Sequence, residues 1–266
     1  MNQYIPMLNY LNTHSIDDSY SKIIVFLLEN RLKLSTISIQ EISESCFVSN
    51  ATISRFSKHF GFENFSNLKN YIFHKSDFSP GYTFRLSQQN FSLLDSNPHK
   101  FLTRYKEVIV ESLDDVVNYL DIKKIDAFLQ IVHQIKNVYI FSSDSSFNLS
   151  KELQGGFFLS GKLTIASDSP EDITRMTKEL DNQTLVIIIS SFGNFLSEHT
   201  EAVNNILKSP CQSYFLTQHT ENMVSSSFTD TISVTSHNHV KAGSYPMAIF
   251  CEFLVRRYHS LYNNIC

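Results

Sequence analysis

The chain has 266 residues, of which 42% are hydrophobic and 18% are charged, and its formal net charge is −4 at pH 7. This composition supports the core of one large domain or of two ordinary domains, and it argues against disorder. Only 7 residues are glycine, and they form neither G-x-G-x-x-G nor G-x-x-x-x-G-K-[ST]. A standard dinucleotide fingerprint and a Walker P-loop are therefore excluded.

The apolar runs are short, and the longest, such as residues 185–189, fall far below the roughly 20 residues of a membrane span. The N-terminus lacks the charged and apolar regions of a signal peptide. The 4 cysteines include no C-x-x-C pair, which fits unpaired thiols in a reducing compartment. We therefore expect a cytoplasmic protein with no membrane partner and no cofactor.

Residues 1–75 show helical spacing of apolar side chains. Ile23, Ile24, Leu27 and Leu28 follow the pattern of one helix face, and shorter segments repeat it further along. This region is predicted to be an all-helical domain. Residues 76–104 are rich in Ser, Asn, Pro and Gln up to Pro98 and have no clear period there, so we interpret 76–104 as a linker.

The remaining region, 105–266, alternates helices with short apolar runs. A helical pattern at 105–134, broken near 118–121, precedes the runs, and a closing helix is expected at about Tyr245–Tyr262. The predicted strands are Asn137–Phe141, Lys162–Ala166, Thr184–Ile189, Cys211–Leu216 and Thr231–Val234. Continuous Val/Ile runs between helices predict an α/β domain with a doubly wound, parallel, five-stranded sheet.

Within the first domain, two short helices are predicted around a turn at residues 46–48. Ser38 and Glu41 have the spacing of a capping box that would start a helix at Ile39–Ser45. Ser49 is a candidate N-cap for a second helix, Asn50–Phe60. Two helices joined in this way form a helix-turn-helix.

The second of these helices has a polar face that contains no acid. Short side chains at its start would let the helix approach base edges in the major groove, and Arg55 and Lys58 could neutralise phosphates. The alternative is an ordinary solvated face. The candidate DNA-binding residues are Ser38, Ser49, Asn50, Ala51, Thr52, Ser54, Arg55, Lys58 and His59.

The run V-S-x-A-T-I-x-R-F-x-K-x-x-G-F-x-x-F-x-x-L-K, from Val48 to Lys69, resembles the N-terminal domain of RpiR-type bacterial transcriptional regulators. The resemblance implies an operator in double-stranded DNA as partner and a response to sugar phosphates. Two departures stand out: Ser43 occupies a position where helix-turn-helix proteins often carry Ala, and Phe47 one where many carry Gly.

The second domain is similar to a SIS (sugar isomerase) domain, the usual C-terminal partner of this helix-turn-helix. With strand order 2-1-3-4-5, a ligand would bind where the loops after the first and third strands meet. Hydroxyls and amides at a helix N-terminus suit a phosphate. The candidate ligand-binding residues are Ser142, Ser145, Ser146, Ser190, Ser191, Gly193 and Thr217.

These loops depart from the family pattern. Ser142 and Asp144 replace the two glycines of the first loop, and Phe192 and Phe195 replace hydroxyl residues of the second. A carboxylate would repel a phosphate dianion by around 4 kcal/mol at about 4 Å and an effective dielectric of 20. The expectation of ordinary phosphosugar binding is therefore weakened, and the alternative is a degenerate domain that serves mainly for dimerisation.

No catalytic residue and no metal site are predicted. Glu152 and Glu198 each follow a ligand loop, but a carboxylate in the first turn of a helix is favoured by the helix dipole alone. His237-x-His239 offers two imidazoles, to which Asp230 or Glu252 could be added, yet histidines in a polar loop are more often solvated.

The sequence thus predicts a regulator of sugar or amino-sugar metabolism genes. Paired recognition helices must meet half-sites about 34 Å apart or a multiple of that distance, so a homodimer or a dimer of dimers is expected. The partners would be an operator in double-stranded DNA and a sugar phosphate or related small effector. The alternative is a SIS-type sugar-phosphate isomerase or lyase with a helical appendage.

Overall fold

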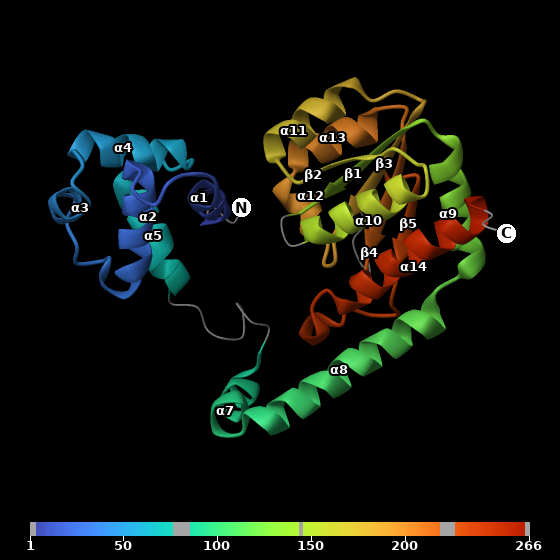
Figure 1. The fold of residues 1–266 in the computed structure, drawn as a ribbon, viewed down its shortest axis with the longest axis horizontal. Helices are drawn as coiled ribbons and strands as arrows, with labels where there is room; N and C mark the ends of the chain where they lie inside the picture. Colours follow the sequence, from blue (N-terminus) through green and yellow to red (C-terminus); the bar gives the residue numbers. More distant parts are fainter. Residues whose placement is uncertain (1–3, 77–85, 144–145, 219–226, 264–266) are drawn as a thin grey trace. The chain divides into compact units, whose positions relative to one another are not determined.

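A computed structural model describes residues 4–76, 86–143, 146–218 and 227–263 (Figure 1). The chain divides into two compact units between Gln88 and Gln89, inside the predicted linker 76–104. Among the helices of the described ranges, none combines the length and the apolar character that crossing a membrane requires.

The N-terminal unit contains only helices in its described part, as expected. They are α1 (Tyr4–Thr13), α2 (Ser19–Glu29), the 3-10 turn η1 (Arg31–Lys33), α3 (Ile39–Cys46), α4 (Asn50–His59) and α5 (Phe65–Ser76). Ile23, Ile24 and Leu27 are buried in a core that also takes side chains from α3, α4 and α5. Leu28, expected on the same face, is instead 40% exposed.

The C-terminal unit begins with helices where an irregular connection was expected. They are α7 (Gln88–Ser96), α8 (Pro98–Tyr119) and α9 (Ile122–Gln134). The side chain of Asn97 accepts a hydrogen bond from the Lys100 amide at 3.0 Å, and Pro98 occupies the first position of α8. Asn and Pro here are helix-start signals rather than loop signals.

The sheet has the predicted order, β2-β1-β3-β4-β5, and all its neighbouring strands are parallel. The strands are β1 (Asn137–Ser142), β2 (Ile165–Ser167), β3 (Thr184–Ile189), β4 (Gln212–Thr217) and β5 (Asp230–Ser233). Every residue of β3 is buried, because helices cover both faces of the sheet.

Alternate strand residues enter two separate cores. Ile187 packs with α9, α10 (Phe147–Leu159) and α14 (Tyr245–Tyr262), whereas Ile188 packs with side chains of α11 (Pro170–Met176), α12 (Phe195–Glu198) and α13 (Thr200–Lys208). Two 3-10 turns complete the described part, η3 (Thr177–Glu179) and η5 (Val240–Ala242). Because the strands are parallel, the loops that follow them lie at one end of the sheet (Figure 1).

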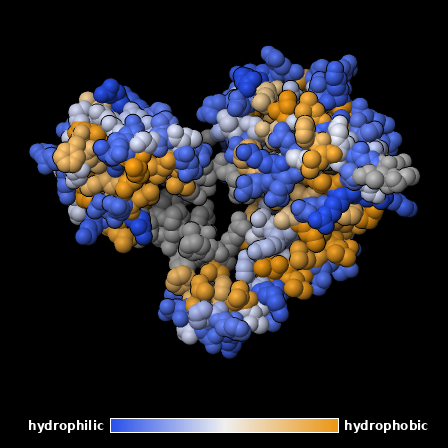
Figure 2. Space-filling view, viewed as in Figure 1, coloured by the Kyte–Doolittle hydropathy of each residue, from blue (hydrophilic) through white to orange (hydrophobic). Residues whose placement is uncertain are grey.

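Hydrophobic side chains are exposed along α7 and α8 (Figure 2). On α8, Leu102, Val110 and Val117 are spaced by eight and seven residues, so they share one side of the helix. Phe91 and Leu94 add to the exposed apolar surface from α7. We call the three α8 residues the α8 apolar stripe.

Candidate functional site

The turn between α3 and α4 is closed by backbone and side-chain hydrogen bonds. The amide of Val48 donates to the Ser43 carbonyl at 3.0 Å, and Phe47 adopts a left-handed conformation with φ 55°. The Ser43 hydroxyl donates to the Val48 carbonyl. Ser43 therefore satisfies a carbonyl of the turn that the usual Ala could not.

Both helices begin with the predicted serine caps. The Ser38 side chain accepts from the Glu41 amide at 3.1 Å, and that of Ser49 accepts from the Thr52 amide at the same distance. Ile42 and Ile53 are fully buried between the helices, and Val48 packs against them. The sequence therefore predicted the helix-turn-helix correctly.

The structure exposes nearly all of the candidate DNA-binding face of α4. Asn50, Ala51, Ser54, Arg55 and Lys58 are exposed, while Ile53, Phe56 and Ser57 face the core. The Arg55 Nε donates only a long bond, 3.4 Å, to the Ala51 carbonyl, so its guanidinium remains available. No acidic residue lies on α4, and the face can approach a polyanion.

Two of the predicted DNA-binding residues make contacts within the N-terminal unit. Thr52 is half-buried and shares a 2.9 Å hydrogen bond with the Ser49 hydroxyl. The His59 ring lies against aromatic rings of the unit, 5.4 Å from Tyr20 and 5.8 Å from Tyr10 between centroids. His59 is exposed, but these contacts give it a packing role at the end of α4.

At the other candidate site, the predicted serines lie where strands β1 and β3 end, and Thr217 ends β4. Ser142, Ser146, Ser190 and Ser191 are all buried, and the hydroxyls of Ser146 and Ser191 are 3.5 Å apart. The two ligand loops therefore meet. Ser145 and Asp144 lie outside the described residues.

The second loop is shaped by its own hydrogen bonds. Gly193 has a positive φ of 78°, which glycine adopts without strain, and its amide donates to the Ser190 carbonyl at 3.2 Å. The Ser190 hydroxyl accepts from the Phe195 amide at 3.1 Å. It can still donate its proton to a ligand.

Among the described residues, several hydroxyls are buried without a hydrogen-bond partner, and three of them lie directly where β1 and β4 end. These three belong to Ser142, Ser143 and Thr217, each at most 2% exposed. A buried hydroxyl without a partner is costly and is usually explained by a bound water, ion or ligand. Ser143 was not predicted, because nothing in the sequence distinguishes it from its serine neighbours.

The two carboxylates after the ligand loops differ in their exposure and in their places on the helices. Glu152 is exposed in the second turn of α10, not the first turn as expected. Glu198 is half-buried at the end of α12, next to His199. Burial lowers the pKa of His199 below its usual value despite the nearby Glu171.

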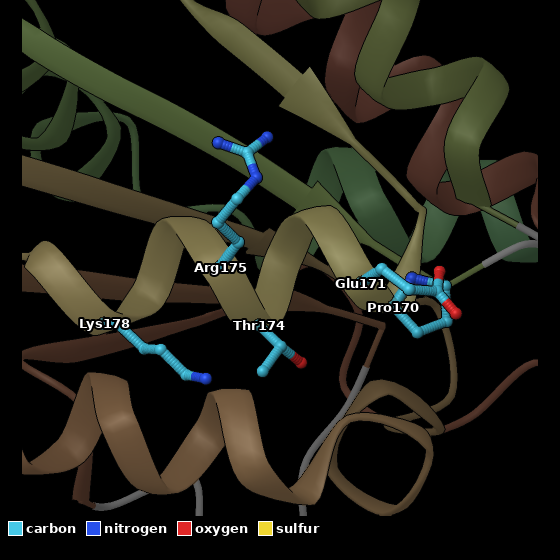
Figure 3. A pocket seen from close by; sticks show the side chains of 5 residues that line it. All are labelled: Pro170, Glu171, Thr174, Arg175 and Lys178. Atoms are coloured by element: carbon cyan, nitrogen blue, oxygen red, sulfur yellow. The ribbon is translucent and has the colours of Figure 1, made fainter.

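A shallow surface depression of about 360 Å³ lies along α11 (Figure 3). It is lined by Pro170, Glu171, Thr174, Arg175 and Lys178. Arg175 is held by Asp172 at 2.7 Å, and Lys178 lies 3.8 Å from Glu201. Since its cations already have carboxylate partners, the depression is a poor anion site.

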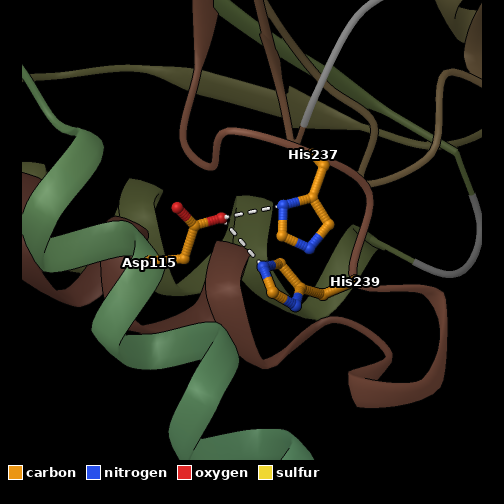
Figure 4. Close-up of side chains that lie close together, drawn as sticks. All are labelled: Asp115, His237 and His239. Carbon is orange, nitrogen blue, oxygen red and sulfur yellow. Dashed lines mark hydrogen bonds and ion pairs between the residues drawn. The ribbon is translucent and has the colours of Figure 1, made fainter.

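In the structure, a carboxylate that the sequence did not suggest lies beside the two histidines of the polar loop, His237 and His239. Asp230 pairs with Lys124 and Glu252 with Arg256. The carboxylate beside His237 and His239 belongs to Asp115 of α8 (Figure 4). No sequence pattern points to this residue, because it lies far from the histidines along the chain.

Comparison with known families identifies the N-terminal unit. The sequence profile described as "Helix-turn-helix domain, rpiR family" matches residues 5–77. The chain carries an rpiR-family helix-turn-helix domain. A search of curated protein sequences found no relative.

Solved structures share the fold of this chain. The Vibrio vulnificus NanR protein complexed with ManNAc-6P matches over 98% of this chain and 93% of its own, with TM-score 0.55 and 16% identity. The sugar isomerase domain of an RpiR transcription factor from Sphaerobacter thermophilus covers 60% of this chain and 90% of its own (TM-score 0.53, 13% identity).

A ligand-bound protein from Escherichia coli CFT073 matches over 67% of this chain and 96% of its own, with TM-score 0.51 and 12% identity. Such low identities establish the fold alone. The structural matches and the strand order confirm the predicted fold class: a helix-turn-helix followed by a parallel five-stranded SIS-like domain.

Proposed function

We propose that this protein is a DNA-binding transcription regulator of sugar or amino-sugar metabolism genes. The observation that carries the proposal is the exposed, acid-free face of α4 within an rpiR-family helix-turn-helix. Asn50, Ala51 and Ser54 would approach base edges in the major groove, and Arg55 and Lys58 would contact phosphates.

The test is binding of the full chain to the DNA upstream of its own gene, at several salt concentrations. Arg55→Ala and Lys58→Ala should each weaken binding, and each lost phosphate contact should reduce the salt slope by about 0.9. Lys208→Ala removes an exposed charge from α13 and serves as the control. Unchanged affinity and slope in both α4 variants would refute the role of this helix.

We also propose that the C-terminal unit binds a sugar phosphate or related carbohydrate at the ends of β1, β3 and β4. Support comes from the unpartnered hydroxyls of Ser142, Ser143 and Thr217, since a polyhydroxy ligand would supply their missing hydrogen bonds. The NanR protein of the same fold is complexed with ManNAc-6P. Differential affinity for two conformations would then couple effector to DNA binding.

The effector is tested by thermal shift with ManNAc-6P, hexose phosphates and unphosphorylated sugars. Thr217→Val removes one unpartnered hydroxyl at nearly constant volume, so the free protein should be as stable or more stable, and the ligand should bind about tenfold more weakly. Thr164→Val is a matched control, because Thr164 is equally buried and unpartnered but precedes β2. No thermal shift with any sugar would favour a purely dimerising domain.

We propose that the unit binds its ligand without converting it. Glu152 is exposed, and the described side chains of Ser142, Ser143, Ser190 and Ser191 in the ligand loops offer hydroxyls rather than a base. The same sugar phosphates incubated with the protein should remain unchanged when followed by NMR. Enzyme-dependent isomerisation would support the isomerase alternative instead.

Two copies of the chain are required if two recognition helices read paired half-sites. We propose that the α8 apolar stripe contributes to the contact with the second copy, because exposed apolar surface on one helix side is otherwise unfavourable. Val117→Glu should shift the protein toward monomer in analytical ultracentrifugation. An unchanged dimer would place the interface elsewhere.

A further inference from the structure

Asp115, His237 and His239 form a compact cluster between α8 and the loop that follows β5 (Figure 4). One oxygen or nitrogen atom of each residue lies within 4.8 Å of the others. Asp115 Oδ2 is 2.8 Å from His239 Nε2 and 3.7 Å from His237 Nδ1. Neither the rpiR-type helix nor the proposed effector site uses these residues.

These distances fit a shared metal ion. Ligand atoms bonded to a tetrahedral zinc at about 2.0–2.1 Å lie roughly 3.3 Å from one another. The two contacts of Asp115 Oδ2, at 2.8 and 3.7 Å, bracket that value. Two imidazoles and one carboxylate are a ligand set that zinc and other first-row divalent ions prefer.

The cluster is held in place from both sides. The amide and hydroxyl of Ser236 both donate to Asp115 Oδ2, at 3.0 and 3.1 Å. The amide of His239 donates to the Gln218 side chain at 3.2 Å.

One side of the cluster is open to solvent. The His239 side chain is only 6% exposed, whereas that of His237 is 61% exposed. An ion could enter on the His237 side, and water would complete its coordination there, as in zinc sites with three protein ligands. We propose that Asp115, His237 and His239 bind a divalent transition-metal ion, with zinc as the best-fitting species.

The bound ion would join α8 to the loop before α14 more firmly than the present hydrogen bonds do. Gln218, which orients His239, directly follows Thr217 of the proposed effector site. Its side chain also donates to the Gly243 carbonyl. The metal site and the proposed effector site would therefore be linked through the adjacent residues Thr217 and Gln218, although metal binding does not depend on the proposed DNA or effector functions.

The experiment uses the untagged full chain, freed of metal with a chelator and titrated with zinc by calorimetry. We expect one zinc per chain, a higher melting temperature on binding, and tetrahedral absorption bands when cobalt replaces zinc. His237→Asn should bind at least tenfold more weakly while folding normally, since this side chain is exposed. Asp115→Asn should weaken zinc binding similarly.

His99→Asn is the matched control, because it removes an exposed histidine from α8, the helix that carries Asp115. This variant should bind zinc like the unaltered chain. Absence of stoichiometric binding at micromolar zinc would overturn the proposal and leave the cluster as a hydrogen-bonded link. Equal affinity in His237→Asn would overturn it as well, since the zinc would then be bound elsewhere.

Discussion

The two candidate sites of this protein are built in opposite ways. The face of α4 is made of neighbouring residues on one helix, and most of its side chains are exposed. The candidate effector site of the C-terminal unit collects hydroxyls from the ends of three strands, and these side chains are buried. A site on one helix follows from local periodicity, whereas a site at strand ends depends on tertiary packing and loop shape.

This difference affects how each site responds to mutation. An exposed charge such as that of Arg55 would contribute to DNA binding with little effect on folding, because surface substitutions usually change stability by less than about 0.5 kcal/mol. A buried hydroxyl such as that of Thr217 would affect both ligand binding and folding, since the free protein carries the cost of burying it. The following variants test whether the two units also behave separately.

The largest expected effect is loss of the N-terminal core. Phe56 is fully buried and packs edge-on to Tyr20, with ring centroids 5.3 Å apart. Phe56→Ala should cost about 3–5 kcal/mol. Calorimetry should then show loss of the N-terminal transition and of DNA binding, with the C-terminal transition unchanged.

Phe157→Ala is the reciprocal variant in the C-terminal unit. Phe157 is equally buried on α10 and lies edge-on to Tyr258 at 5.1 Å. It should lower only the C-terminal transition, by a similar free energy. A common shift of both transitions in either variant would show that the two units unfold as one.

The next effect concerns the close packing of α10 on α14. A Cβ atom on Gly156 would lie 2.2 Å from Val255 Cγ1. This distance is so short that the Val255 side chain or one of the two helices would have to move. Gly156→Ala should therefore destabilise the C-terminal unit by about 1–3 kcal/mol, measured by urea unfolding. Adding Val255→Ala should recover part of the loss.

The neighbouring glycine supplies the control. Gly155 lies on the same helix, and a Cβ there would have no neighbour within 4 Å. Gly155→Ala should stabilise the unit by up to about 1 kcal/mol through helix propensity. Equal responses at the two positions would contradict the close approach of the helices.

Much of this fold could be predicted because the relevant signals are local. Serine caps at Ser38 and Ser49 set the start of the two helices, and the apolar runs located the five strands to within a few residues. The sequence pattern places Asn97 and Pro98 in a linker, but in the structure Asn97 is the N-cap of α8 and Pro98 is its first residue. The same residue types favour loops and helix starts, and only the structure distinguishes the two.

The sites were predictable to different degrees. The α4 face was correctly predicted to be polar and exposed except at the half-buried Thr52, and only packing against Tyr10 and Tyr20 shows that His59 has a second role. In the C-terminal unit the loops were located, but the unpartnered Ser143 hydroxyl and the Asp115 carboxylate were not. Both depend on contacts between distant segments, which a single sequence does not reveal.

A smaller effect is expected at the start of α2, where Asp18 is the N-cap. It accepts from the Tyr10 hydroxyl and the Tyr20 amide, both at 2.8 Å. Burial acts to raise its pKa, but these hydrogen bonds outweigh it and lower the pKa below the usual value. This stabilisation is therefore complete above the unfolded-state pKa and is lost as the pH falls through the lowered folded-state pKa.

Two substitutions separate the cap from the charge. Asp18→Ala should cost about 1 kcal/mol at pH 7 through loss of the cap. Asp18→Asn retains a good cap but removes the titrating group, so melting of the N-terminal transition should depend less on pH below about 4. An unchanged acid dependence in Asp18→Asn would assign that dependence to other carboxylates.

The smallest effect should be a gain in stability at the turn between α3 and α4. Phe47 is 91% exposed and holds a left-handed conformation that costs a non-glycine residue roughly 1–2 kcal/mol. Phe47→Gly should therefore stabilise the N-terminal unit, by somewhat less than this because glycine also gains freedom in the unfolded chain. Phe47→Ala keeps the Cβ and should give no such gain. If Phe47→Gly stabilises the unit yet weakens DNA binding, the exposed ring belongs to the DNA-contacting surface, which would then extend beyond α4 into the turn.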